Sequence, residues 1–156
     1  MEKFWKLPPR VKVLEALGSI ADKRINIISE KKEKGKTIVK AVCISSTKDK
    51  VYTITYIIED NAIVANDNGS KFRGYLGYPS IALLMLKKKL SYDATLAFAL
   101  KGIPWKKWNE QFKNYYKTEF MAKKVAEKKG INEKKIDRFI EKVLREIKES
   151  KFKVLT

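Results

Sequence analysis

The sequence contains no histidine, one cysteine and one glutamine, and the first two of these shortages exclude whole classes of chemistry. Without histidine, the chain cannot build a Ser-His-Asp triad or a zinc site of mixed cysteine and histidine ligands. The single thiol, Cys43, cannot form an internal disulfide, and its apolar strand context predicts a buried, unreactive group. Phosphate-binding loops, dinucleotide fingerprints, nucleophile elbows and metal-ligand spacings are missing as well. We therefore expect no metal, no cofactor and no enzymatic activity.

Carboxylates leave one route to catalysis open. Asp60 and Asp67 flank a predicted strand and Asp93 lies at a helix start, so the fold could cluster them as a two-metal nuclease requires. Turn formation and helix capping are sufficient reasons for all three aspartates.

Long apolar stretches are also missing. The longest apolar run is Ile81–Leu86, which is too short to span a bilayer. The first residues of the chain lack the apolar core of a signal peptide. We therefore expect a soluble, cytoplasmic protein with no membrane partner.

Basic residues are abundant and evenly distributed. The chain has 35 Lys and Arg against 18 Asp and Glu, a net charge of +17. Residues 101–156 hold 17 of these basic and 8 of these acidic residues, so the two parts carry +8 and +9. Surface ion-pair networks of the kind found in heat-stable proteins explain the charge density but not its sign. The excess of cations favours a polyanionic partner such as nucleic acid.

Alternating β-branched residues predict four strands after a first helix over about residues 9–21. The short turns between the strands imply an antiparallel meander. The predicted strands are residues 24–30, 37–46, 51–58 and 62–66. The fold class is therefore α+β: a four-stranded antiparallel β-meander packed against helices, with a helical C-terminal extension. Residues 1–103 would form the sheet-plus-helix domain and residues 104–156 the extension, packed together as one unit.

The helices are concentrated in the second half. The apolar segment 80–90 predicts the central helix against the sheet, and Ser91 is expected to cap a short helix after it. Pro104 opens a long aromatic helix that ends near Gly130, and Asn132 caps the last helix.

The last helix carries an apolar stripe with coiled-coil-like spacing. Two interpretations remain open: the stripe faces the core, or it joins copies of the chain into a homo-dimer or tetramer. Its members are Ile136, Phe139, Ile140, Val143 and Ile147.

The stretch 66–79 joins the two halves and concentrates cations and aromatic rings among glycines. Gly69, Gly74 and Gly77 remove side chains that would hold another backbone away. Its candidate binding residues are Lys71, Phe72, Arg73, Tyr75 and Tyr78. This mixture suits single-stranded nucleic acid better than a small polar substrate, because cations contact phosphates and rings stack on bases. The alternative is a loop across the sheet edge whose tyrosines fill the core.

Further cations lie on or near the predicted sheet, at Arg10, Arg24 and Lys40. Tyr52 and Tyr56 share one strand face, which we assign to the core rather than to base stacking. Trp5 and Trp105 are weaker candidates for the rim of a cleft. The signatures of RRM and KH domains are missing, and the helices are poorly proportioned for a helix-turn-helix.

The opening residues 7–22, LPPRVKVLEALGSIAD, the four-strand meander and the Gly/Tyr stretch at 74–79 resemble one family. They are similar to the N-terminal domain of archaeal ThermoDBP and ThermoDBP-related proteins, over roughly residues 5–105. The resemblance implies a single-stranded DNA-binding domain without an OB fold, a cleft between sheet and helices that takes the strand, and C-terminal helices that drive oligomerisation. This chain ends in two helices rather than an extended zipper.

We therefore predict a non-catalytic protein that binds single-stranded DNA, or RNA, with little sequence preference. The competing hypothesis is a self-associating scaffold domain with weak or no nucleic-acid binding.

Overall fold

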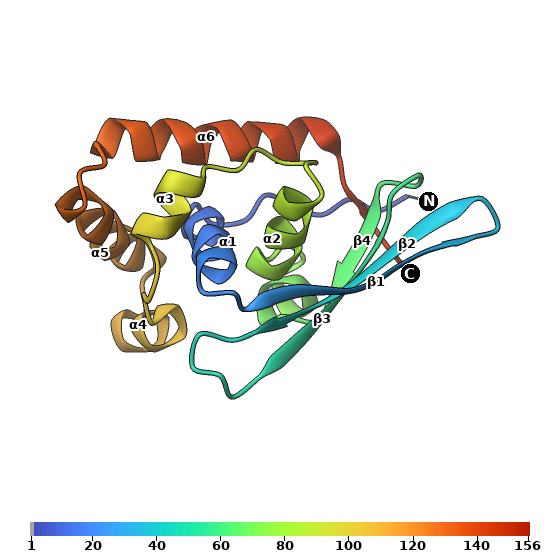
Figure 1. Cartoon of the computed structure of the whole chain (residues 1–156), viewed down its shortest axis with the longest axis horizontal. Helices are drawn as coiled ribbons and strands as arrows, with labels where there is room; N and C mark the ends of the chain where they lie inside the picture. The colour runs from blue at the N-terminus through green and yellow to red at the C-terminus, as the bar shows by residue number, and fades with distance from the viewer. Residues whose placement is uncertain (1) are drawn as a thin grey trace.

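The computed structural model describes residues 2–156 (Figure 1). One helix precedes four consecutive strands, and helices dominate the remainder. Their order is α1 (Val11–Ala21), β1 (Ile25–Glu33), β2 (Lys36–Ile44), β3 (Val51–Ile57), β4 (Ala62–Ala65), the π-helical turn η1 (Gly69–Arg73), α2 (Tyr78–Leu86), α3 (Ala94–Ala99), α4 (Trp105–Phe112), α5 (Tyr115–Lys128), α6 (Glu133–Ser150) and β5 (Lys153–Val154).

The strands form one mixed sheet in the order β1-β2-β3-β4-β5. The first four pair antiparallel as consecutive neighbours, which confirms the α+β class and the predicted meander. The prediction was incomplete at the other edge, where β5 pairs parallel to β4 through Ala62 and Lys153. A strand of two residues is too short to show alternation in the sequence. It forms only when the C-terminal segment returns to the sheet.

The two faces of the sheet differ in burial. One face is closed by helices and contributes Val39, Cys43, Ile54, Tyr56 and Ile63 to the core, so the assignment of Tyr56 to the core is confirmed. The other face remains open. Apart from Lys40, the side chains on this face are β-branched: Ile38, Lys40, Val42, Thr53, Thr55 and Val64.

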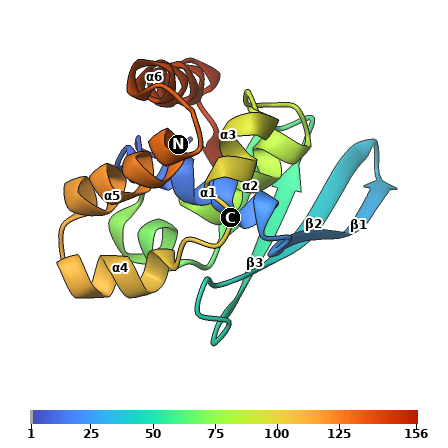
Figure 2. The same ribbon diagram turned by 60° about the vertical axis from the view of Figure 1, so that its left-hand side comes forward.

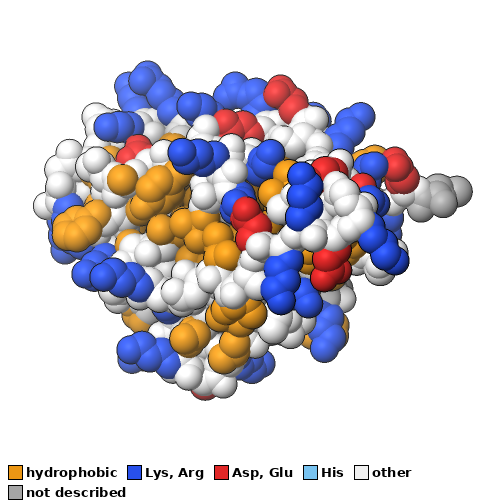
Figure 3. All heavy atoms as spheres, turned by 45° about the vertical axis from the view of Figure 1, so that its right-hand side comes forward, with side chains coloured by type: hydrophobic (Ala, Val, Ile, Leu, Met, Phe, Trp, Pro, Cys, Tyr) orange, Lys and Arg blue, Asp and Glu red, His pale blue; other side chains and the backbone are white. Residues whose placement is uncertain are grey.

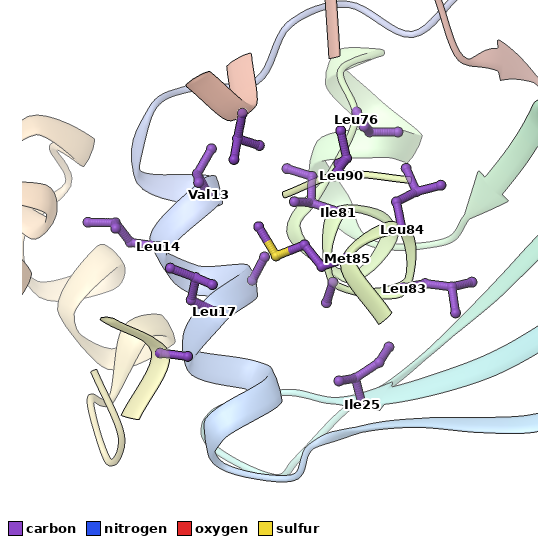
Figure 4. Close-up of a cluster of buried hydrophobic side chains, with 14 of the residues drawn as sticks. Val13, Leu14, Leu17, Ile25, Leu76, Ile81, Leu83, Leu84, Met85 and Leu90 are labelled. Atoms are coloured by element: carbon purple, nitrogen blue, oxygen red, sulfur yellow. The ribbon is translucent and has the colours of Figure 1, made fainter. Parts of the chain in front are cut away.

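Helix α2 packs directly on the sheet, and α1 packs against α2, α3, α5 and α6. In Figure 4, Ile81 and Met85 of α2 point toward α1. Helix α1 is therefore surrounded, and even its polar residues Lys12, Glu15 and Ser19 are buried. The hydrophobic core takes residues from both predicted parts of the chain.

The long helix predicted after Pro104 is two helices. Lys113 adopts a left-handed backbone with φ of 52°, and the Asn114 side chain accepts hydrogen bonds from the backbone of Tyr116 and Lys117. Asparagine caps a helix start in this way, which ends α4 and begins α5. Asp93, rather than Ser91, caps α3, whereas Asn132 caps α6 as predicted. Within residues 2–156, no helix is both long and apolar enough to cross a membrane.

The apolar stripe of α6 faces the core of its own chain. Ile136, Ile140, Val143 and Ile147 are all buried in the single chain, and Phe139 packs beside them half-buried. Figures 1 and 2 show α6 lying across the outside of the helical layer, so its inner face is covered by the other helices. The stripe that we offered as a self-association surface is therefore core.

The buried thiol of Cys43 makes the free energy of unfolding fall as the pH becomes alkaline. Burial raises the pKa of this thiol from 9.0 to about 11. The folded chain then keeps the proton where the unfolded chain loses it, so stability falls as pH rises from about 9 to 11. We expect the wild type to lose about 2–3 kcal/mol more than Cys43→Ala over this range, measured by urea unfolding. Equal losses in both proteins would contradict the assignment.

Candidate nucleic-acid interface

A cleft of about 440 Å³ opens where α1, the stretch 66–78 and the start of α4 and α5 meet the end of the sheet. Its walls come from segments far apart in the sequence: Lys12 and Glu15 of α1, Tyr52 of β3, residues 67–69, and the α4–α5 junction at 113–115. The cleft therefore exists only in the assembled fold.

Close packing at glycines shapes one wall of this cleft. A side chain on Gly69 would place its Cβ 2.3 Å from the Tyr75 ring, and one on Gly77 would lie 2.0 Å from an Asp67 oxygen. Asp67 in turn accepts hydrogen bonds from the Ser70 backbone at 3.2 Å and from its hydroxyl at 2.7 Å, which fixes the start of η1. The glycines let the Tyr75 ring and the Asp67 carboxylate lie directly against the backbone.

The floor of the cleft is a buried ion pair. Lys12 Nζ lies 3.0 Å from Glu15 Oε2, one turn further along α1, and both side chains are almost fully covered. Burial alone would lower the pKa of Lys12, but Glu15, Tyr75 and Tyr115 outweigh it and raise that pKa above its ordinary value. Lys12 Nζ also lies 4.5 Å from the centroid of the Tyr115 ring. The floor therefore holds a permanent cation that is matched by an anion.

Aromatic rings form much of the lining. Tyr52, Tyr75, Tyr78 and Tyr115 all border the cleft, and Tyr52 and Tyr78 meet edge to face with centroids 6.3 Å apart. Burial raises the pKa of the Tyr75 and Tyr78 hydroxyls, so both rings are uncharged at neutral pH. Trp105 closes the bottom and packs against the backbone of Gly18. Neutral rings at several angles are suited to contact with flat apolar groups.

Cations border the opening of the cleft. Lys106 pairs with Asp49 at 2.9 Å, and this hydrogen bond raises the pKa of Lys106. Arg73 and Lys113 are exposed and form no ion pair within residues 2–156. Glu110 of α4 also lines the cleft. The opening therefore presents two cations whose charge is available to a ligand.

A sequence profile described as "Uncharacterised conserved protein UCP014422" matches residues 5–153. The chain belongs to the UCP014422 family. No curated protein and no solved structure matches it. The match to UCP014422 spans the sheet, the cleft and all six helices, so the whole architecture described above is that of a family member.

In this UCP014422 member the fold brings part of the predicted site together. Arg73, Tyr75 and Tyr78 line the cleft. Lys71 and Phe72 lie beside Arg73 on η1, where the exposed Phe72 ring is 5.4 Å from Lys71 Nζ. Lys71 and Phe72 are not among the residues that line the cleft, so three of the five predicted residues of this stretch lie in it.

Two predicted arginines are engaged inside the protein instead. Arg10 donates to Asp137 at 2.8 Å and pairs with Glu119 at 3.3 Å, so it connects α5 and α6 to the start of α1. Arg24 is only 5% exposed and donates to the Ile44 carbonyl at 2.8 Å. Its guanidinium lies 5.8 Å from the Tyr78 ring centroid. Neither arginine lines the cleft: Arg10 joins helices, and Arg24 lies against Tyr78.

Lys40 and Trp5 lie away from the cleft. Lys40 projects from the open face of the sheet, opposite the face that carries Tyr52. Trp5 donates its indole N–H to the Ile63 carbonyl at 2.8 Å, beside β4. Neither residue contributes to the cleft, whereas Trp105 does so from its buried floor.

The three aspartates that could have formed a two-metal nuclease site each have a separate structural role. Asp60 pairs with Lys36 at 2.7 Å, Asp67 accepts from Ser70, and Asp93 caps α3. Among residues 2–156 no group of three potential metal ligands occurs.

The sequence did not lead us to predict Lys12 and Glu15 as residues of the cleft. Lys12 and Glu15 carried a usable signal, because they stand three residues apart within a helix that is otherwise apolar or small. A charged pair on a helix of that kind is buried wherever the helix is surrounded. Tyr115 and Lys113 had no such signal, since their place depends on the break between α4 and α5.

Proposed function

We propose that this protein binds single-stranded DNA, with little sequence preference and without a chemical step. The observation that carries the proposal is the cleft in which the rings of Tyr75, Tyr78 and Tyr115 stand beside the unpaired cations Arg73 and Lys113. Rings and cations together are how sequence-tolerant proteins hold a single strand, because every base has a π face and every nucleotide a phosphate.

The aromatic residues of the lining support a single strand rather than a duplex as the ligand. Bases within a duplex stack on one another and offer only their edges, whereas the bases of a single strand expose their faces. Several aromatic rings are among the residues that line this cleft, and two of them meet edge to face. A single strand with splayed bases fits such walls, and the resemblance of residues 5–105 to ThermoDBP-related domains supports the same proposal.

The distribution of charge supports a polyanionic ligand. Lys and Arg side chains are spread over the face drawn in Figure 3, and hydrophobic side chains emerge between them. Inside the cleft, Lys12 and Glu15 neutralise each other, so the attraction for phosphate comes from the opening and the surrounding surface. The pairing of Lys12 with Glu15 supports a binding role for the cleft rather than a catalytic one.

Arg73→Ala is expected to weaken the binding of a fluorescently labelled oligothymidylate by about three- to tenfold. The loss of one phosphate contact should also reduce the slope of log affinity against log salt by about 0.7. Anisotropy titrations at several salt concentrations measure both quantities, and the same titrations with oligouridylate compare RNA with DNA. Lys40→Ala removes an exposed cation from the opposite face and should leave both quantities unchanged. Absence of salt-dependent binding by the wild type would refute the proposed function.

The alternative function, a self-associating scaffold, has lost the surface that we assigned to it. The stripe of α6 is buried in its own chain, which leaves no exposed apolar helix face of that length on α6. Homo-oligomerisation through another surface would be compatible with strand binding, and light scattering measures it independently of the oligonucleotide titrations.

A further inference from the structure

Helix α5 exposes large aromatic side chains that the core does not use. Tyr116 is 79% exposed and Phe120 is 53% exposed. They stand four residues apart and therefore occupy the same face of the helix, with Cβ atoms about 5–6 Å apart. Figures 1 and 2 show α5 at the end of the molecule remote from the β1–β2 hairpin, on the outside of the helical layer.

Lysines alternate with these rings. Lys124 Nζ lies 5.1 Å from the centroid of Phe120, and Lys117 Nζ lies 5.0 Å from that of Phe112 at the end of α4. The acidic residues of α5 are engaged elsewhere or with one of these lysines: Glu119 is buried against Arg10 and Lys123, and Glu127 pairs with Lys124 at 3.6 Å. The face combines cations and rings, as the cleft does.

This aromatic face begins one residue after the part of α5 that lines the cleft. Tyr115 and Asn114 line the cleft, and Tyr116 is the next residue in the chain. The side chain of Asn114 accepts a hydrogen bond from the Tyr116 backbone at 2.9 Å, so the first turn of α5 is held in place. Tyr116 follows Tyr115 in the chain and lies about 100° further round α5, so the face that carries Tyr116 and Phe120 adjoins the part of α5 that lines the cleft.

We propose that α5 is a second stacking surface, on which a single strand continues after it leaves the cleft. The occupant is a nucleic-acid strand because the lysines complement its phosphates and the rings complement its bases. The 5–6 Å between Tyr116 and Phe120 exceeds the 3.4 Å rise per nucleotide of a stacked duplex strand, and so suits adjacent nucleotides that have been drawn apart. This inference rests on the proposed function and extends it to a longer binding site.

The test compares two lengths of oligothymidylate with two forms of the full chain. Oligomers of about 6 and about 15 nucleotides are titrated against the wild type and the double variant Tyr116→Ala, Phe120→Ala by fluorescence anisotropy. We expect the double variant to lose at least tenfold in affinity for the longer oligomer and to bind the shorter one as the wild type does. Both side chains are largely exposed, so the fold tolerates their removal.

A matched control is Tyr92→Ala, which removes an exposed tyrosine from the segment before α3, beside Glu146 of α6. It should leave the binding of both oligomers unchanged. Wild-type affinity of the double variant for the longer oligomer overturns the inference, and so does an equal loss for both lengths. Either result leaves the cleft intact as a binding site, provided that the wild type binds. Failure of the wild type to bind either oligomer refutes the proposed function itself and the inference with it.

Discussion

Replacing Lys12 by methionine is expected to lower the free energy of unfolding by about 3–5 kcal/mol. Methionine keeps the length and the apolar stem of lysine, so the packing of α1 changes little. The loss arises at Glu15, whose carboxylate is buried and would have no cation within reach. Its remaining contact is the Asn109 side chain at 3.5 Å, which is too long to replace an ion pair. Urea unfolding of wild type and Lys12→Met at pH 7 measures the difference.

The double variant Lys12→Met, Glu15→Leu provides the control for this prediction. It removes both charges, and a buried pair exchanged for apolar residues of similar volume is often neutral in stability. We expect the double variant to recover most of the loss, which isolates the uncompensated carboxylate as its cause. A single variant that loses less than about 1 kcal/mol would show that water reaches Glu15 and that the floor of the cleft is wet.

The same pair explains why a small-residue, apolar helix carries charge at its centre. A buried ion pair of this kind often adds little net stability over an apolar pair of similar volume. Lys12 lies against the Tyr115 ring and raises the polarity of the floor beneath the Tyr75 hydroxyl. The pair therefore places Tyr115 at the point where the cleft meets α5.

The parts of the fold that were predictable depend on local pattern. The meander β1–β4 and helix α2 follow from alternation and from a continuous apolar run, which neighbouring residues decide. Strand β5 has two residues and pairs with a strand some ninety positions earlier, so its formation depends on tertiary contacts. The break between α4 and α5 was partly predictable from the sequence. Asn114 is a helix-capping residue, but no glycine or proline marks the end of α4.

The candidate site was predictable only where it lies on one continuous stretch. Arg73, Tyr75 and Tyr78 were found because residues 66–79 concentrate glycines, rings and cations. Arg10 misled the prediction because its carboxylate partners, Glu119 and Asp137, are 109 and 127 positions away. The chemistry of an arginine is the same whether it meets a phosphate or a carboxylate. Only the fold decides which of the two is present.

The apolar stripe of α6 supplies the largest expected effect of a single substitution. Ile140 lies near the middle of α6 and has no exposed surface. Its side chain packs in the core that the C-terminal helices share with α1 and α2. The stripe has the spacing of a coiled coil, but the partner helices belong to the same chain. A charge at this position must therefore enter the core or force α6 away from it.

Ile140→Asp is expected to destabilise the monomer by about 5 kcal/mol or more, because it removes a buried aliphatic group and buries an unpaired carboxylate. This loss is comparable to the whole stability of many domains and should lower Tm by about 10–20 °C or prevent folding. Circular dichroism melts and light scattering make the measurement. Lys142→Asp places the same residue at an exposed position of the same helix and should change Tm by only a few degrees. A folded Ile140→Asp protein with wild-type Tm and an altered oligomeric state would instead assign the stripe to self-association.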